Sequence, residues 1–259
     1  MDLESLLFYL LLLVLGFGVL QAVFIGGLFF FKRTGEKRAN AFFALLLITF
    51  GLTLLHNIFT VVGFYQIHQR LYFLPIYYTL AFPVLLFFYV KLNLYPKYKL
   101  RWTDSKHFIL PLGQWIFFVV LFLTTIEYKS QIDRSFFNPF FGAFEQFLYL
   151  TTFFAYMYFA YRYVQQKRKN LSNPREAKKV LYLRKLLQIL FVLFCVHSIF
   201  VVADFISFEL LNINMRSVKS YAAFGILSFA ALLFWLGIYG FQVLLWGRKI
   251  FKLDQKAKS

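Results

Sequence analysis

The chain has 259 residues with a net charge of +17; 61% of them are apolar, 38 are phenylalanine, and the mean hydropathy is +0.66. Soluble domains average nearer half apolar residues, so this composition excludes an ordinary soluble fold and indicates a lipid environment. In a soluble protein the charge would suggest nucleic acid, but here the cations sort by membrane side, and we expect no direct nucleic-acid binding.

Seven apolar stretches follow one another along the chain, each bounded by charged or turn residues. A helix needs about 20 mostly apolar residues to cross a bilayer, and irregular backbone cannot lie unsatisfied in lipid, so each stretch predicts a transmembrane helix. The predicted spans are 6–31, 40–63, 71–94, 107–126, 137–161, 186–208 and 221–246. The expected fold is an all-α, polytopic seven-helix bundle that forms a single domain over residues 1–259.

Lysine and arginine set the expected orientation. One side, made of the first, third and fifth loops with Lys91 and the C-terminal tail, carries 23 of the 28 basic residues, and the other side carries five. Cytoplasmic loops are enriched in these residues, so we predict an outside N-terminus and a cytoplasmic C-terminus. The fifth loop has a basic face that either binds a cytoplasmic partner or lies solvated near anionic lipid, formed by Lys167, Arg168, Lys169, Lys178 and Lys179.

Four ionisable residues inside the predicted spans are the candidates for function, because such residues are costly in lipid: Glu145, His56, His197 and Asp204. Counted at about 1.5 Å per residue, all four lie in the outer half of the bilayer or near its middle. Tyr149 shares a helix face with Glu145, and Ser228 begins a polar stripe in the last span.

Two interpretations of these residues stay open. They line a ligand pocket that opens outward, or they form hydrogen bonds that hold the helices together. A proton site on a buried carboxylate is also compatible with the residues. We expect no metal, because the two histidines and two acids are spread over three spans without a close-spaced ligand pair. Cys195, the only cysteine, excludes an internal disulfide.

Signatures of enzymes are missing: the chain has no P-loop, GxSxG or HExxH motif. We therefore expect no enzymatic activity and no cofactor. A retinal protein needs a lysine deep in its last span, but Lys219 lies at the edge of that span and the next lysine is Lys249. Retinal is therefore not expected.

Three short motifs resemble a known family. The stretch FPVLLFFYVK at 82–91 is similar to the GPLLYLYV stretch in the membrane-embedded sensor region of membrane-bound bacterial AraC-type regulators. HFILP at 107–111 looks like the HF-x-P that opens the next span there, and the basic loop 32–38 with Asn40 matches the start of that region's second span.

The resemblance implies a multi-span sensor of the bacterial inner membrane that feeds a cytoplasmic DNA-binding domain. Only thirteen residues follow Trp246, too few for a helix-turn-helix, so we expect any signal to pass through a separate partner.

The preferred hypothesis is a receptor-like membrane protein that binds a ligand or partner from the outer side and signals through its basic cytoplasmic face. The alternative is a structural or assembly subunit of a membrane protein complex. A small transporter or proton-coupled permease is a third hypothesis, disfavoured because the inner half of the spans has few polar residues.

Overall fold

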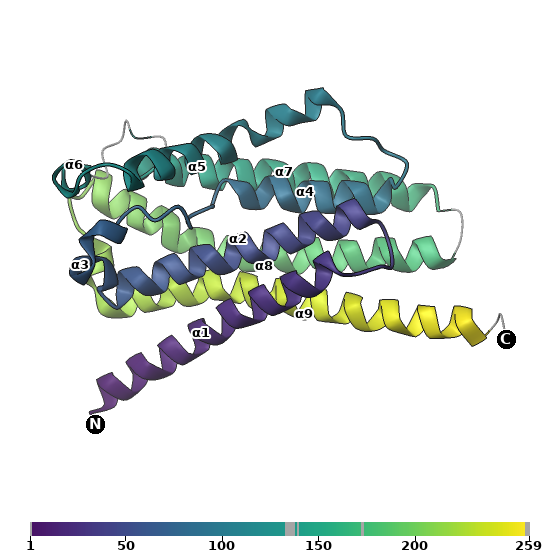
Figure 1. The fold of residues 1–259 in the computed structure, drawn as a ribbon, viewed down its shortest axis with the longest axis horizontal. Coiled ribbons are helices and arrows are strands. Elements are labelled where there is room, and N and C mark those ends of the chain that lie inside the picture. The colour runs from purple at the N-terminus through teal and green to yellow at the C-terminus, as the bar shows by residue number, and fades with distance from the viewer. Residues whose placement is uncertain (1, 133–137, 139, 172–173, 257–259) are drawn as a thin grey trace.

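The structure is a computed structural model that describes residues 2–132, 138, 140–171 and 174–256. Within these residues the regular structure is helical and includes no strand. The long helices pack side by side in one bundle, with the N- and C-termini at opposite ends (Figure 1). They are α1 (Leu3–Phe30), α2 (Lys37–Val61), α4 (Ala81–Leu94), α5 (Ile109–Phe122), α7 (Ala143–Lys169), α8 (Pro174–Glu209) and α9 (Lys219–Lys256).

Short helices fill the connections. At the end of the bundle that holds the N-terminus lie α3 (Phe64–Ile67) and α6 (Ile126–Ser130) (Figure 1). The 3₁₀ turn η1 (Gln69–Leu71) follows α3, η2 (Trp102–Phe108) leads directly into α5, and η3 (Met215–Ser217) joins α8 to α9.

Among the described residues, five helical stretches are long and apolar enough to cross a membrane, one of them η2 and α5 together. This indicates a helical membrane protein, as the composition predicts. The five stretches coincide with the first, second, fourth, sixth and seventh predicted spans: Glu4–Phe30, Lys37–Val61, Trp102–Phe122, Glu176–Glu209 and Lys219–Leu245. Of the remaining two long helices, α4 is apolar but has only 14 residues, and α7 has 27 residues but a high content of tyrosine, glutamine and threonine.

The third predicted span differs from the structure. We predicted a helix over 71–94, but α4 begins only at Ala81, and most of the stretch before it is irregular. Within that stretch the backbone of Phe73 has a positive φ of 62°, which is rare for an aromatic residue and turns the chain inward. The predicted start of the fifth span, residue 137, lies outside the described residues, and α7 begins at Ala143.

The core of the bundle is built around α4, which packs between α2 and α7. Every α4 residue except Asn93 is buried, and a helix enclosed on all sides is expected to be apolar all round. Its Phe82 stacks on Phe50 of α2 with ring centroids 3.8 Å apart. On the other side of α7, Phe153 and Phe194 stack at 3.6 Å. These aromatic pairs fix the spacing of the central helices.

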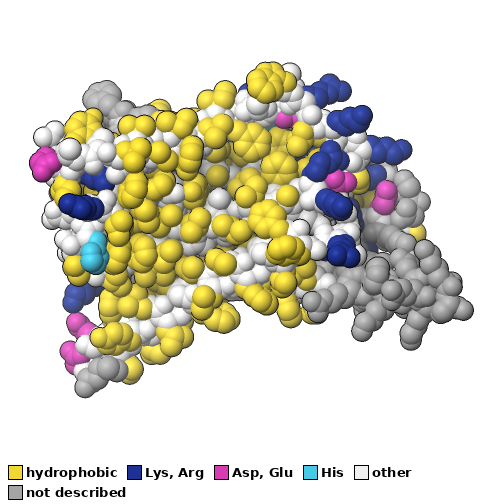
Figure 2. Space-filling view, in the orientation of Figure 1, with side chains coloured by type: hydrophobic (Ala, Val, Ile, Leu, Met, Phe, Trp, Pro, Cys, Tyr) yellow, Lys and Arg dark blue, Asp and Glu magenta, His cyan; other side chains and the backbone are white. Residues whose placement is uncertain are grey.

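The side chains on the surface change from apolar to basic along the bundle axis. Figure 2 shows apolar side chains across the middle of the visible face and a concentration of Lys and Arg at the end opposite the N-terminus. An apolar band next to a basic end is the arrangement that the charge count along the sequence leads us to expect.

Candidate functional site

The irregular segment 72–80 enters the bundle and depends on polar side chains from other helices. The Tyr78 backbone N–H donates to the Thr53 hydroxyl of α2 at 3.0 Å. The Leu80 backbone N–H donates to Oε1 of Gln114 in α5 at 3.1 Å. Backbone without regular structure is tolerated inside a membrane protein only when such partners satisfy it. Thr53 and Gln114 therefore hold the entry to α4 in place.

Glu145, in the first turn of α7, is held by the same segment. The Thr79 hydroxyl donates to the Glu145 carboxylate and accepts from Gln114 Nε2 at 3.0 Å. The Tyr77 hydroxyl donates toward Glu145 Oε2 at 3.4 Å. Only 3% of Glu145 is exposed. Thr79 lies two residues before α4 begins, so the carboxylate is near the N-terminus of that helix, where the helix dipole favours negative charge.

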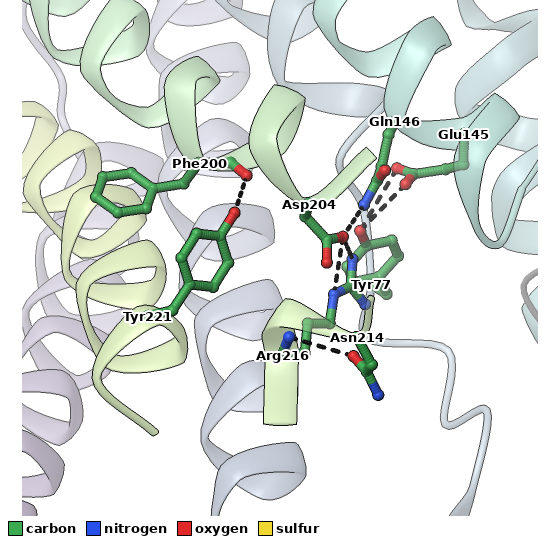
Figure 3. A network of polar contacts seen from close by, with 8 residues as sticks. All are labelled: Tyr77, Glu145, Gln146, Phe200, Asp204, Asn214, Arg216 and Tyr221. Carbon is green, nitrogen blue, oxygen red and sulfur yellow. Dashed lines mark hydrogen bonds and ion pairs between the residues drawn. The ribbon is translucent and has the colours of Figure 1, made fainter. Parts of the chain in front are cut away.

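Asp204 of α8 takes part in a second network, next to the first. Its Oδ2 accepts from Gln146 Nε2 at 2.7 Å, and from Nε and Nη2 of Arg216 at 3.0 and 2.8 Å. Figure 3 shows Arg216 reaching from η3 toward Asp204, with Gln146, Glu145 and Tyr77 beyond it. The Arg216 side chain is about half exposed and the Asp204 side chain is buried. The pair therefore connects the surface to the polar interior.

His197 and Ser228 form a third contact, between α8 and α9. The Ser228 hydroxyl donates its one proton to the Gly225 carbonyl at 2.6 Å. His197 Nδ1, 2.9 Å from Ser228 Oγ, must then be the donor in that hydrogen bond. In the neutral tautomer that donates from Nδ1, Nε2 is an acceptor. The Tyr149 ring lies edge-on to this histidine, with centroids 6.1 Å apart.

Two buried polar atoms on α7 have no hydrogen-bond partner among the described residues, the Tyr149 hydroxyl and the Gln146 side-chain carbonyl. Their residues are three positions apart and therefore share one face of the helix. Buried polar groups are nearly always paired, so these two atoms represent unused hydrogen-bonding capacity.

His56 of α2 joins this region through an aromatic contact. Its Nδ1 lies 2.9 Å from the Tyr65 hydroxyl, and its ring centroid is 5.1 Å from that of Tyr77. All six residues predicted for the pocket thus lie toward the end of the bundle that holds α3 and α6. They form three adjoining networks along α7. We refer to Tyr77, Thr79, Glu145, Gln146, Tyr149, His197, Asp204 and Arg216 as the α7 polar cluster.

Several members of the cluster, and the neighbouring Gln114, were not predicted from the sequence. Tyr77 and Thr79 lie in the segment expected to be helical, and Arg216 lies in a loop outside the predicted spans. Gln114 and Gln146 are uncharged, so a search for ionisable residues passed over them. An amide within an apolar stretch was the available signal, because its four hydrogen-bonding sites require partners in lipid.

No group of three or more potential metal ligands is close enough to hold an ion within the part of the chain that the structure describes. The contacts described for the cluster are hydrogen bonds, ring contacts and the ion pair between Arg216 and Asp204.

The basic face predicted for the fifth loop spans a helical hairpin. Lys167, Arg168 and Lys169 end α7, and Lys178 and Lys179 follow in the first turns of α8. Lys167 pairs with Glu176 at 3.3 Å. Burial lowers the pKa of Lys179, although Glu36 and Glu176 oppose that shift. Burial also lowers the pKa of Lys32, after α1, to about 8, and the neighbouring Lys179 adds to this effect.

No protein-family model, curated protein or solved structure matches this chain. The resemblance to AraC-type sensor regions stays a prediction.

Proposed function

We propose that the protein is a receptor-like, seven-span protein of the cytoplasmic membrane that binds a ligand or partner from the outer side at the α7 polar cluster. The observation that carries this proposal is the unused hydrogen-bonding capacity of Tyr149 and Gln146, buried among charged partners. A cluster that served only to hold helices together would be expected to satisfy its own members. A ligand hydroxyl, amine or carbonyl would satisfy them here.

The seven-span topology that we propose includes α4 and α7. At about 1.5 Å per residue, the 14-residue α4 covers about 21 Å of a hydrocarbon core that is about 30 Å thick. The irregular segment before it completes the crossing, shielded from lipid by α2, α5 and α7. The polar residues that satisfy this segment support the proposal, because they would be unnecessary in a loop exposed to water.

The route that we propose for the signal is α4. Its N-terminal end meets the cluster through Thr79 and Leu80. Near its other end, Lys91 pairs with Asp104 of η2 at 3.7 Å and lies 3.8 Å from the centre of the Tyr98 ring. A ligand that shifts the start of α4 would move this ion pair at the basic end of the bundle, because a packed helix moves as a rigid element.

Co-purification tests the proposal. The protein is extracted from native membranes in mild detergent, and mass spectrometry identifies bound small molecules and proteins. We expect a bound small molecule that is lost in Tyr149→Phe. The variant itself should fold at least as stably as the wild type, because it removes a buried hydroxyl that has no partner.

Tyr158→Phe is the matched control, since Tyr158 lies on the same helix and is 60% exposed. It should retain the molecule. The proposal is wrong if the wild type emerges without a ligand and Tyr149→Phe is destabilised, because the hydroxyl would then have a purely structural role.

The alternative, an assembly subunit, is supported by one feature of α1. Its N-terminal end diverges from the bundle (Figure 1), and the helix exposes Leu13, Phe17 and Leu20 at 61–70%. A stoichiometric membrane partner in the same co-purification, lost when this face is changed, would favour this second function.

A further inference from the structure

A groove of about 320 Å³ lies at the basic end of the molecule, between the last turn of α7 and the first turns of α8. Its lining combines two kinds of side chain. Three are cationic, Arg168, Lys178 and Arg184, and the principal apolar ones are Leu171, Val180 and Leu181. The groove is separate from the α7 polar cluster, which lies toward the other end of the bundle.

The groove has unbalanced positive charge. Residues 162–185 include nine basic side chains and one acid, Glu176, which pairs with Lys167. Arg168 and Arg184 form no ion pair within the described residues, and the buried Nε of Arg184 has no hydrogen-bond partner there. The surface therefore favours an anion.

The apolar side of the groove is open. Leu171 is 41% exposed and Leu181 is 61% exposed. Both lie beside cations, a combination that suits a ligand with a charged head and an apolar body.

The end of the groove nearest the membrane lies at the height of the headgroup layer. Arg184 lies two residues before the sixth predicted span, 186–208. At about 1.5 Å per residue, Arg184 is about 3 Å and Leu181 about 8 Å outside the hydrocarbon. The headgroup layer of one leaflet is about 5–8 Å thick.

We propose that this groove binds one anionic phospholipid of the cytoplasmic leaflet. The cations Arg168, Lys178 and Arg184 hold the phosphate, and the exposed Leu171 and Leu181 contact the glycerol backbone. Basic pockets between helices at the cytoplasmic side are the setting in which anionic headgroups bind. The proposal does not depend on the function proposed for the α7 polar cluster.

Native mass spectrometry tests it. The purified protein is exposed to equal amounts of phosphatidylglycerol and phosphatidylcholine in mild detergent, and the retained lipid is identified. We expect one phosphatidylglycerol per chain. The double variant R168Q/R184Q should bind it about thirtyfold more weakly, from the loss of two cations near the headgroup.

The control is K97Q/K99Q, which removes the same charge from another basic loop and should retain the lipid. Glycerol phosphate, which lacks acyl chains, should not displace it. Equal retention of both lipids by the wild type would overturn the proposal, as would equal losses in the two double variants. Displacement by glycerol phosphate would reduce the site to one for a free anion. A stoichiometric acidic protein in the groove would replace the lipid as its occupant.

Discussion

Gly51 lets α1 and α2 approach closely. A Cβ at this position would lie 2.9 Å from the Ala22 Cβ, and Ala22 is fully buried. The Ala22 atom is attached to its helix backbone, so the two helices must move apart to accept Gly51→Ala. We expect the variant to lose about 1–3 kcal/mol of stability. A thiol-reactive dye that reports on Cys195 during thermal unfolding in detergent measures the loss.

Gly27→Ala is the control for this contact, because a Cβ there meets nothing within 4 Å. Its stability should stay unchanged or rise slightly, since alanine favours a helix over glycine. Equal destabilisation by both substitutions would show that helix flexibility, and not the contact between α1 and α2, requires these glycines.

Arg216 supplies the cation for a carboxylate that the sequence places within a span. Arg216→Gln leaves Asp204 buried without its positive partner, and we expect a loss of about 1–3 kcal/mol in the same unfolding assay. Combining Asp204→Asn with Arg216→Gln should recover part of the lost stability, because the asparagine amide leaves no unpaired charge buried at position 204.

Lys219→Gln is the control, because it tests whether the loss of an exposed ion pair lowers stability as much as Arg216→Gln does. The Lys219–Glu4 pair is 3.5 Å long, and its side chains are 91% and 83% exposed. Exposed pairs contribute little, so this variant should unfold like the wild type. If Arg216→Gln also unfolds like the wild type, the Asp204 pair has no stabilising role.

At the scale of elements, the segment 72–80 depends on Thr53. Replacing Thr53 with valine keeps the shape of the side chain but removes the acceptor for the Tyr78 N–H. A buried N–H without a partner costs about 1–3 kcal/mol, and the unfolding temperature should fall accordingly.

Thr49→Val makes the same change one turn earlier in α2. The Thr49 hydroxyl bonds only to carbonyls of its own helix, Leu45 and Leu46. Those carbonyls keep their helical partners in the variant, so we expect almost no change. If the two variants are equally stable, the hydrogen bond to Tyr78 does not hold the segment.

The same segment shows what the sequence can and cannot predict. The apolar character of 71–94 was sufficient to place it in the bundle, because burial follows from composition. Where the helix begins was not predictable, since that depends on Thr53, Gln114 and Glu145, which are distant in sequence and meet it only in the folded chain. Pro75 and Pro83 were local signals, because the residue before a proline disfavours the helical conformation and a proline is tolerated in the first turn of a helix.

The candidate site likewise contains residues that the sequence predicts and residues that it does not. Glu145, His56, His197 and Asp204 could be found because a charge in an apolar stretch is rare. Ser228, the partner of His197, was found as the start of a polar stripe. Most other partners could not be found, because hydroxyls and amides are common and only the packing of helices selects which of them meet.

At the scale of the whole molecule, the distribution of charge predicts which end faces the cytoplasm. Single cysteines in a Cys195→Ala background test this prediction at four exposed positions, Gln69, Ser105, Ser130 and Ser217. A membrane-impermeant thiol reagent added to intact cells should label Gln69→Cys, Ser130→Cys and Ser217→Cys. Ser105→Cys should react only after the membrane is permeabilised.

Each pair of positions isolates particular helices. Only α4 lies between Gln69 and Ser105 among the long helices, so opposite labelling of these two positions requires the short α4 and its irregular entry to cross together. Between Ser130 and Ser217 lie α7 and α8, and α8 is long and apolar enough to cross. If α7 crosses as well, the two serines share a side. Labelling of only one of them would mean that α7 stays out of the bilayer. The α7 polar cluster would then lie at the membrane surface, and its charged residues would no longer indicate a binding site inside the membrane.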